Sequence, residues 1–147
     1  MSAPYGGPRT GSCRRVAAWA IVLAVAAVHV LRAGSHLHGA SFRFYYSYAS
    51  DILLPLAAYF VLCLSEPRLP LLRDWRAKAA LVSGVASTAE VLQGFGVPAL
   101  GRTFDPLDLL MYAIGALLAV LLDKVLVGAL CRHRAPTQLS GAPRADA

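Results

Sequence analysis

Apolar residues dominate four stretches of the chain, and shorter polar segments separate them. The pattern predicts helices at residues 16–34, 49–65, 77–96 and 106–128. Each is close to the ~20 residues that a helix needs to cross a bilayer. The sequence therefore predicts an all-α polytopic membrane protein built as a bundle of four transmembrane helices.

The remaining segments read as tails and connections. Residues 1–15 are rich in Gly, Pro and Ser and predict a flexible cytoplasmic tail, and 131–147 predict a disordered cytoplasmic tail. The membrane domain is expected over 16–130. An aromatic loop is expected at 35–48, because tyrosines suit the membrane–water interface. A basic tail before an apolar run also fits a signal peptide, but no clear Ala-x-Ala site follows, so an uncleaved helix is favoured.

The third and fourth predicted helices each have a face of small and polar residues. At 100° per residue, one face of the third helix holds Ser83, Ser87, Glu90 and Gly94. The opposite face is apolar and holds Leu81, Val82, Val85, Ala89 and Leu92. In the fourth helix Asp108, Tyr112, Gly115 and Ala119 share a face. Small residues let helix backbones approach closely in membranes. The faces of small and polar residues are therefore expected to pack inside the bundle, while the opposite apolar faces contact lipid.

Composition supports the membrane class. Hydrophobic residues make up 57% of the 147 residues and charged residues 15%, against roughly 25% charged in soluble domains. The net charge of +6 accompanies no nucleic-acid-binding pattern. Of the 14 Lys and Arg residues, 11 lie at the tails and the middle loop. The positive-inside rule therefore predicts a multi-pass protein of the plasma membrane with both termini in the cytoplasm.

The cysteines give little sign of a covalent framework. Cys13, Cys63 and Cys131 are far apart in sequence, and the predicted topology puts all three at or near the cytoplasmic side. No Cys-x-x-Cys spacing occurs, and the His36-x-His38 pair alone is weak evidence for a metal. We expect no disulfide framework, no metal site and no cofactor.

Several polar residues interrupt the apolar pattern near the predicted outer end of the last two helices. They are Glu90, Gln93, Arg102, Asp105 and Asp108. An ionised side chain at membrane depth costs about 2.5–3.5 kcal/mol on insertion scales. Glu90 must therefore be protonated, paired or in a watery cavity, and a functional or site-forming role is favoured over a structural ion pair. Arg102 is its first candidate partner and Arg43 its second.

The acids also admit a simpler interpretation as helix starts. Asp105, Pro106 and Asp108 have the order of an N-cap, a first-turn proline and a first-turn acid. Asp51 follows the potential N-cap Ser50 and fits a helix start better than a ligand. Capping and site-forming roles stay open for Asp105 and Asp108, and Arg102 could simply extend to the interface.

The stretch "AEVLQ…GRTFDPLDLLMYAIGALLA" resembles the signature of the VanZ-like family, small four-helix membrane proteins named for a teicoplanin-resistance factor. The family pattern runs Glu-x-x-Gln, a loop, Arg-x-x-Asp-x-x-Asp, then Asn and Gly. Glu90, Gln93, Arg102, Asp105, Asp108 and Gly115 match it, whereas Tyr112 stands where the family usually has Asn. The resemblance is most specific over about residues 87–122 and implies a cell-envelope protein linked to antibiotic resistance, with no established reaction.

Two main functions follow as hypotheses. The first is an envelope factor whose outward Glu/Gln/Arg/Asp pocket, with Tyr112 and secondarily Asp51 and Arg43, binds a lipid headgroup, an envelope precursor or a lipoglycopeptide such as teicoplanin. The second is a membrane enzyme on a lipid-linked substrate with Glu90 and Asp108 as acid and base. No nucleophile is evident, so the enzyme is less favoured, and a small transporter less still. The bilayer is the expected partner, with a homo-oligomer as a further one.

Overall fold

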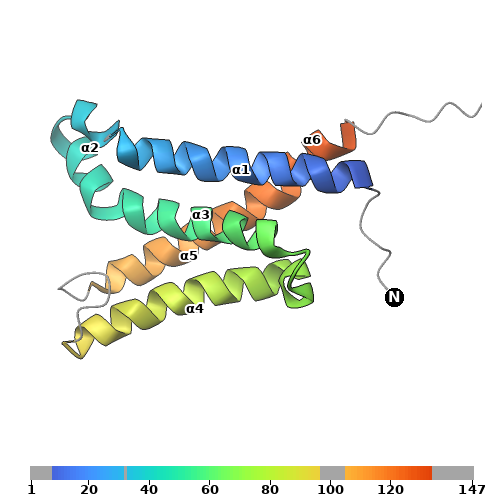
Figure 1. The fold of residues 1–147 in the computed structure, drawn as a ribbon. Coiled ribbons are helices and arrows are strands. Elements are labelled where there is room, and N and C mark those ends of the chain that lie inside the picture. The colour runs from blue at the N-terminus through green and yellow to red at the C-terminus, as the bar shows by residue number, and fades with distance from the viewer. Residues whose placement is uncertain (1–7, 32, 97–104, 134–147) are drawn as a thin grey trace, which may run out of the picture.

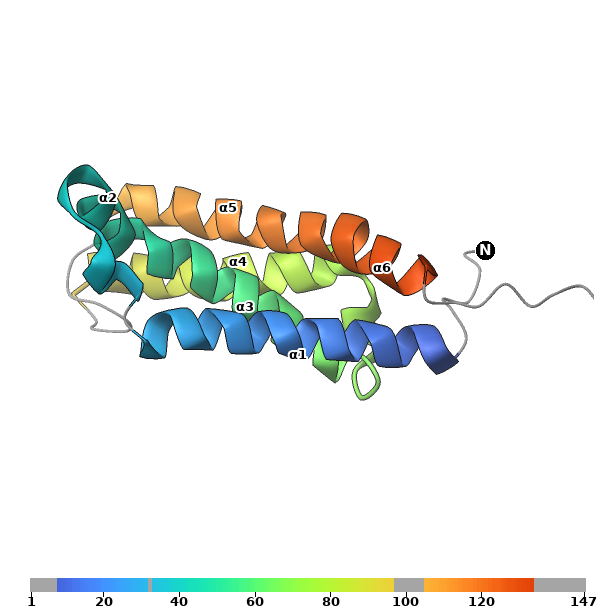
Figure 2. The same cartoon turned by 90° about the horizontal axis from the view of Figure 1, so that it is seen from above.

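The computed structural model describes residues 8–31, 33–96 and 105–133. Over these residues the protein is all-α, as predicted, with four long helical segments. Each segment runs opposite to the one before it, so the start of the first, the end of the last and the connection between the middle two lie at one end of the bundle (Figure 1). Figure 2 shows the same arrangement from above. We call this end the basal end and the opposite one the distal end.

The first half of the chain supplies two of the segments. They are α1 (Pro8–Val30), followed by the 3₁₀ turn η1 (Ala33–His36), and a continuous helix of α2 (Gly39–Phe44), the π-helical turn η2 (Tyr45–Ala49) and α3 (Ser50–Ser65).

The second half supplies the other two. They are α4 (Trp75–Gly94), which follows the 3₁₀ turn η3 (Pro70–Arg73), and a continuous helix of α5 (Pro106–Leu121), the π-helical turn η4 (Leu122–Val127) and α6 (Gly128–His133).

Three predicted boundaries are wrong. The predicted tail 1–15 is already helical from Pro8, and the predicted aromatic loop 35–48 is mostly helix from Gly39 onward. Gly39 has φ +66° and makes the turn into α2, and no glycine or proline follows until Pro55, so nothing breaks the helix. Ser50 and Asp51 therefore lie inside a helix, and neither has the helix-start role expected of it. Likewise α6 extends to His133, into the predicted C-terminal tail.

Three of the segments are long and apolar enough to cross a membrane. Among the described residues these candidate spans are Gly11–Val30, Gly39–Ser65 and Pro106–Cys131. The fourth segment, α4, has 20 residues but is less apolar, because it carries Arg76, Lys78, Glu90 and Gln93. The four-span prediction is thus supported for three segments, and α4 packs beside them as the polar member of the bundle.

The outer surface of the bundle is apolar. Large hydrophobic side chains on every segment are exposed, including Leu23, Leu54, Val85, Leu117 and Leu121. A soluble monomer rarely exposes large apolar patches. A lipid environment would cover these side chains, in agreement with the candidate spans.

The interior is held by close contact between α3 and α5. A Cβ atom added to Gly115 would collide with the backbone carbonyl oxygen of Ile52, so only glycine allows this approach. Ala119, one turn further, is fully buried together with Tyr59 and Phe60 of α3. α1 packs on α3, and α4 packs on both α3 and α5. This packing places the ends of α3, α4 and α5 beside one another.

The contact at Gly115 makes a direct prediction. Gly115→Ala should lower the stability of the bundle by about 1–3 kcal/mol, as overpacking of a filled core does. Gly84→Ala is the matched control, because nothing lies within 4 Å of its added Cβ; it should be neutral or stabilising by about 0.5–1 kcal/mol. Thermal unfolding in detergent micelles, followed by circular dichroism, measures both. Equal melting temperatures for the two variants would contradict the close packing of α3 on α5.

Candidate functional site

Glu90 links α4 to the beginning of α5. Its side chain is only 1% exposed, and its Oε1 accepts a hydrogen bond of 2.7 Å from the backbone N–H of Asp105. The hydroxyl of Tyr112, in the second turn of α5, donates to Oε2 over 3.5 Å. A carboxylate that accepts from a backbone N–H makes one of the stronger hydrogen bonds in proteins. Glu90 therefore connects the two halves of the family-like motif, the Glu-x-x-Gln segment of α4 and the segment from Asp105 to Tyr112 at the beginning of α5.

Asp105 caps α5, as the simpler interpretation predicted. Its Oδ1 accepts from the backbone N–H of Leu107 at 2.9 Å, and Pro106 follows at the first helical position. In a capping box, the acid three residues after the cap would accept from the N–H of the cap residue. Here Glu90 of another helix occupies that N–H. The carboxylate of Asp108, the acid at that third position, is thus not needed for capping, and it is partly exposed.

The other predicted pocket residues differ in where the structure places them. Asp51 of α3 is partly exposed and within electrostatic range of Glu90 and Asp105, and Asp108 is within range of Asp51. Gln93 is buried one turn after Glu90 on α4. Arg43 is exposed on α2 and makes no ion pair with a described residue. Arg102, the first candidate partner of Glu90, lies outside the described residues. The structure thus gathers acids from α3, α4 and α5 at the distal end.

The predicted packing faces hold in part. Gly115 and Ala119 are buried in α5, and Ser83 and Ser87 are half-buried in α4. Gly94 is exposed at the end of α4, whereas Val82, expected on the lipid-facing side, is buried in the core. The inward face of α4 is therefore rotated toward its buried residues Lys78, Val82, Glu90 and Gln93.

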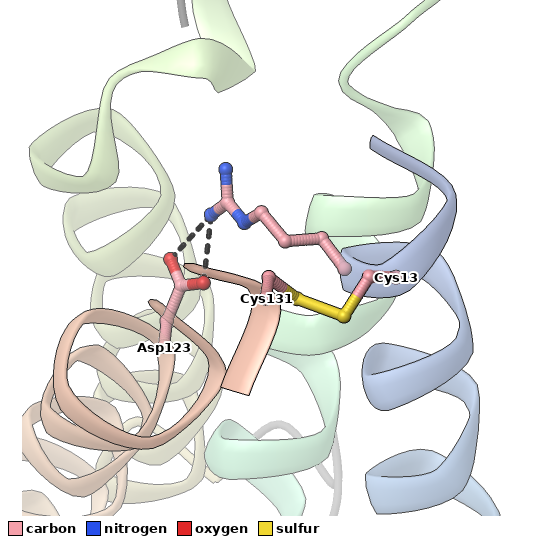
Figure 3. Close-up of a disulfide and its surroundings, with 4 residues drawn as sticks. Cys13, Asp123 and Cys131 are labelled. Atoms are coloured by element: carbon pink, nitrogen blue, oxygen red, sulfur yellow. Dashed lines mark hydrogen bonds and ion pairs between the residues drawn. A yellow bond between two sulfur atoms is a disulfide. The ribbon is translucent and has the colours of Figure 1, made fainter. Parts of the chain in front are cut away.

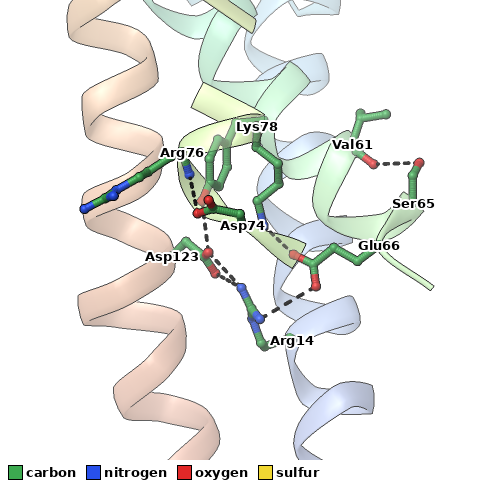
Figure 4. Close-up of polar contacts among 9 residues, drawn as sticks. Arg14, Val61, Ser65, Glu66, Asp74, Arg76, Lys78 and Asp123 are labelled. Atoms are coloured by element: carbon green, nitrogen blue, oxygen red, sulfur yellow. Dashed lines mark hydrogen bonds and ion pairs between the residues drawn. The ribbon is translucent and has the colours of Figure 1, made fainter. Parts of the chain in front are cut away.

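A second polar cluster, at the basal end, was not expected from the sequence. Asp123, in the π-helical turn η4, is 6% exposed, and both of its carboxylate oxygens accept from Nη2 of Arg14 at 2.7 Å. The hydroxyl of Tyr59 donates to Oδ2 over 3.1 Å. Figure 4 shows the Arg14 guanidinium beside the Asp123 carboxylate. This cluster joins α1, α3 and η4.

Lys78 and Glu66 extend the cluster to α4. Lys78 is 1% exposed; its Nζ donates to Oε1 of Glu66 and lies 5.0 Å from the centre of the Tyr59 ring. Nη1 of Arg14 lies 3.8 Å from Oε2 of Glu66, so Arg14 contacts both carboxylates (Figure 4). Two cations and two anions therefore balance within the bundle. Buried charges are tolerated when they are paired and hydrogen-bonded in this way.

The sequence carried only a faint signal for this cluster. Lys78 and Arg14 were counted with the basic residues of the positive-inside pattern, and Asp123 is a single acid near the end of an apolar run. The hydrogen-bonded partners of Asp123 are 64 and 109 positions away along the chain. No local spacing could reveal pairs that arise only when three segments pack together.

The expectation of no disulfide is wrong. Cys13 of α1 and Cys131 of α6 are bonded, with their Cα atoms 5.7 Å apart, although 118 positions separate them (Figure 3). The bond forms because the beginning of α1 and the end of α6 lie side by side at the basal end. Cys63 is a free, half-buried thiol on α3.

No protein-family model, curated protein or solved structure matches this chain. Within the described residues, no three His, Cys, Asp or Glu side chains converge as metal ligands. The long apolar helices and the apolar exterior place the chain in the class of helical membrane proteins. They specify no particular activity.

The basal cluster predicts a large effect of a single substitution. Asp123→Asn removes the charge that faces Arg14 in a nearly dry site, so it should destabilise the bundle by about 3–5 kcal/mol, as breaking a buried ion pair does. Arg15→Gln, an exposed cation next to Arg14 in sequence, is the control and should change stability by about 1 kcal/mol or less. Unfolding in detergent measures both. An Asp123→Asn protein as stable as the control would show that the pair does not hold the bundle.

The disulfide offers a test of orientation. Cytosolic thiols are usually kept reduced, and the positive-inside rule predicts a cytoplasmic basal end, which this disulfide does not fit. In a Cys63→Ser background we therefore expect an impermeant maleimide, applied after an impermeant reductant, to label Cys13 and Cys131 only in permeabilised cells. Cys63→Ser leaves these two as the only cysteines of the sequence, and the reductant exposes their thiols. Labelling in intact cells would place the basal end outside, in an oxidising compartment where the bond is structural.

Proposed function

We propose that the chain is an integral membrane protein of the cell envelope of the VanZ-like type. Its distal polar cluster faces outward and binds a lipid headgroup, an envelope precursor or a lipoglycopeptide. Binding there lowers the sensitivity of the cell to teicoplanin. The resemblance of residues 87–122 to the family signature motivates this proposal, and the contacts of Glu90 support it.

The observation that carries the proposal is the burial of Glu90 between the two halves of the motif. An ionised acid at membrane depth needs a partner, and the partners of Glu90 come from the motif itself. Glu90 bonds the backbone of Asp105 and faces the hydroxyl of Tyr112. This supports a role in which Glu90 positions the cluster and the partly exposed acids Asp51 and Asp108 meet the ligand.

Tyr112 fits this arrangement although the family usually has Asn at its position. Its ring is buried in the core of the bundle, and its hydroxyl reaches Glu90 from α5. A phenol is larger than an amide but presents a donor at its tip in the same way. We propose that Tyr112 takes over the donor role toward Glu90 in this chain.

The second hypothesis, an enzyme with Glu90 and Asp108 as acid and base, rests on the gathering of Asp51, Glu90 and Asp108 within electrostatic range of one another. Carboxyl groups so placed can hold different protonation states, as acid–base pairs do. Glu90 is almost fully buried, however, so a substrate would meet Asp108 first. The binding function is therefore proposed ahead of catalysis.

The test is teicoplanin sensitivity, with vancomycin as the comparison drug, in cells that express each protein at matched membrane levels. Wild type should raise the inhibitory concentration of teicoplanin, and Glu90→Ala and Arg102→Ala should abolish this effect. Glu90→Ala leaves the Asp105 N–H without its acceptor, a loss of about 1–3 kcal/mol at the site. Leu92→Ala, an exposed apolar position on the same helix, is the matched control and should protect like wild type.

The outcomes separate the hypotheses. No protection by wild type would remove the antibiotic role for this chain. Protection by Glu90→Ala equal to wild type would mean that the cluster is structural. Loss of protection in Glu90→Gln with retained ligand binding would favour the enzyme, since the amide keeps the acceptor but cannot transfer a proton. A variant absent from the membrane would point to a structural role for that residue.

A further inference from the structure

Trp75 at the basal end carries two cations on its ring. The ammonium nitrogen of Lys124, from η4, lies 3.9 Å from the ring centre, and the guanidinium carbon of Arg76 lies 5.5 Å from it. Trp75 is the first residue of α4, and its ring packs partly against the core, which fixes its position. The α4 and η4 segments, which are distant in sequence, thus bring two positive charges to one tryptophan ring.

Neither cation is neutralised by the nearby acids. Asp123 is engaged by Arg14 and Tyr59, Glu66 by Lys78 and Arg14, and Asp74 caps α4 through the backbone N–H of Arg76. Among the described residues, no carboxylate pairs with the side chain of Arg76 or with Lys124. Both side chains are exposed, and Figure 4 shows Arg76 pointing away from the Glu66–Lys78 pair. The pair of charges is therefore available to an external anion.

The surroundings fit a lipid better than a free anion. Leu117 and Leu121 precede Lys124 by seven and three residues, so they lie on the same side of the helix, and both are more than half exposed. They form an apolar track that leads along the bundle to the two cations. Tryptophan is enriched at the depth of lipid headgroups. An acyl chain would lie along the track while its phosphate meets the charges.

We propose that Arg76 and Lys124, the two cations over the Trp75 ring, bind the phosphodiester of an anionic phospholipid at the basal end. Arg76 supplies paired N–H donors to the phosphate oxygens, and Lys124 supplies a point charge. This site is separate from the distal cluster around Glu90, and it does not depend on the function proposed for that cluster. It would anchor η4 and α4 to the membrane surface.

The test uses fluorescence of Trp75 in the full chain. Trp19→Phe leaves Trp75 as the sole tryptophan of the two. Phosphatidylglycerol with brominated acyl chains is titrated into detergent micelles of the protein, and brominated phosphatidylcholine serves as the uncharged comparison. We expect saturable quenching at lower mole fractions of the anionic lipid. Arg76→Gln and Lys124→Gln should each raise the half-saturating fraction about fivefold, as expected for one basic residue at an anionic surface.

Two controls separate a specific site from general attraction. Lys124→Arg keeps the charge and should bind like the parent. Arg68→Gln removes an exposed cation of the turn after α3, away from the Trp75 ring, and should change nothing. Equal quenching by both lipids, or equal weakening by Arg68→Gln, would overturn the proposal. So would displacement of the lipid by millimolar inorganic phosphate at constant ionic strength, because the occupant would then be a free anion.

Discussion

The ion pair between Arg14 and Asp123 is the interaction on which the basal half of the structure depends. An uncompensated charge inside an apolar bundle is far more costly than an apolar residue, so Asp123 requires a cation from another segment. Arg14 meets that requirement and brings α1 against η4. Cys13, next to Arg14, then lies within bonding distance of Cys131. The ion pair and the disulfide together close the bundle between its first and last helices.

The same constraint explains why α4 differs from the other three segments. It carries a buried cation near its beginning, Lys78, and a buried acid near its end, Glu90. Each has a partner on a neighbouring element, Glu66 for Lys78 and the Asp105 backbone for Glu90. A helix with these residues is less apolar than a typical span, yet inside the bundle its polar groups are satisfied and its outer face remains apolar.

The two polar ends have different characters. The basal cluster balances two cations against two acids and is largely closed to solvent, which suits a structural role. The distal cluster has more acids than partners among the described residues, and Asp51 and Asp108 remain partly exposed. Between them, the contact of Gly115 with Ile52 fixes α5 against α3. The distal acids therefore lie at the end of closely packed helices, as the proposed binding site requires.

The sequence alone determined the all-α class and the approximate position of the long apolar segments, because these follow from local periodicity. It offered the capping of α5 as one of two roles for Asp105, and the structure shows the capping hydrogen bond. It also singled out Glu90, since an acid amid apolar residues is costly wherever it lies. The continuous helix through residues 39–65 was missed, because aromatic residues permit both a loop and a helix. The partner of Glu90, the cluster around Asp123 and the disulfide were decided only by the tertiary structure. Each joins residues that are distant in the chain, and such contacts form only when the segments pack.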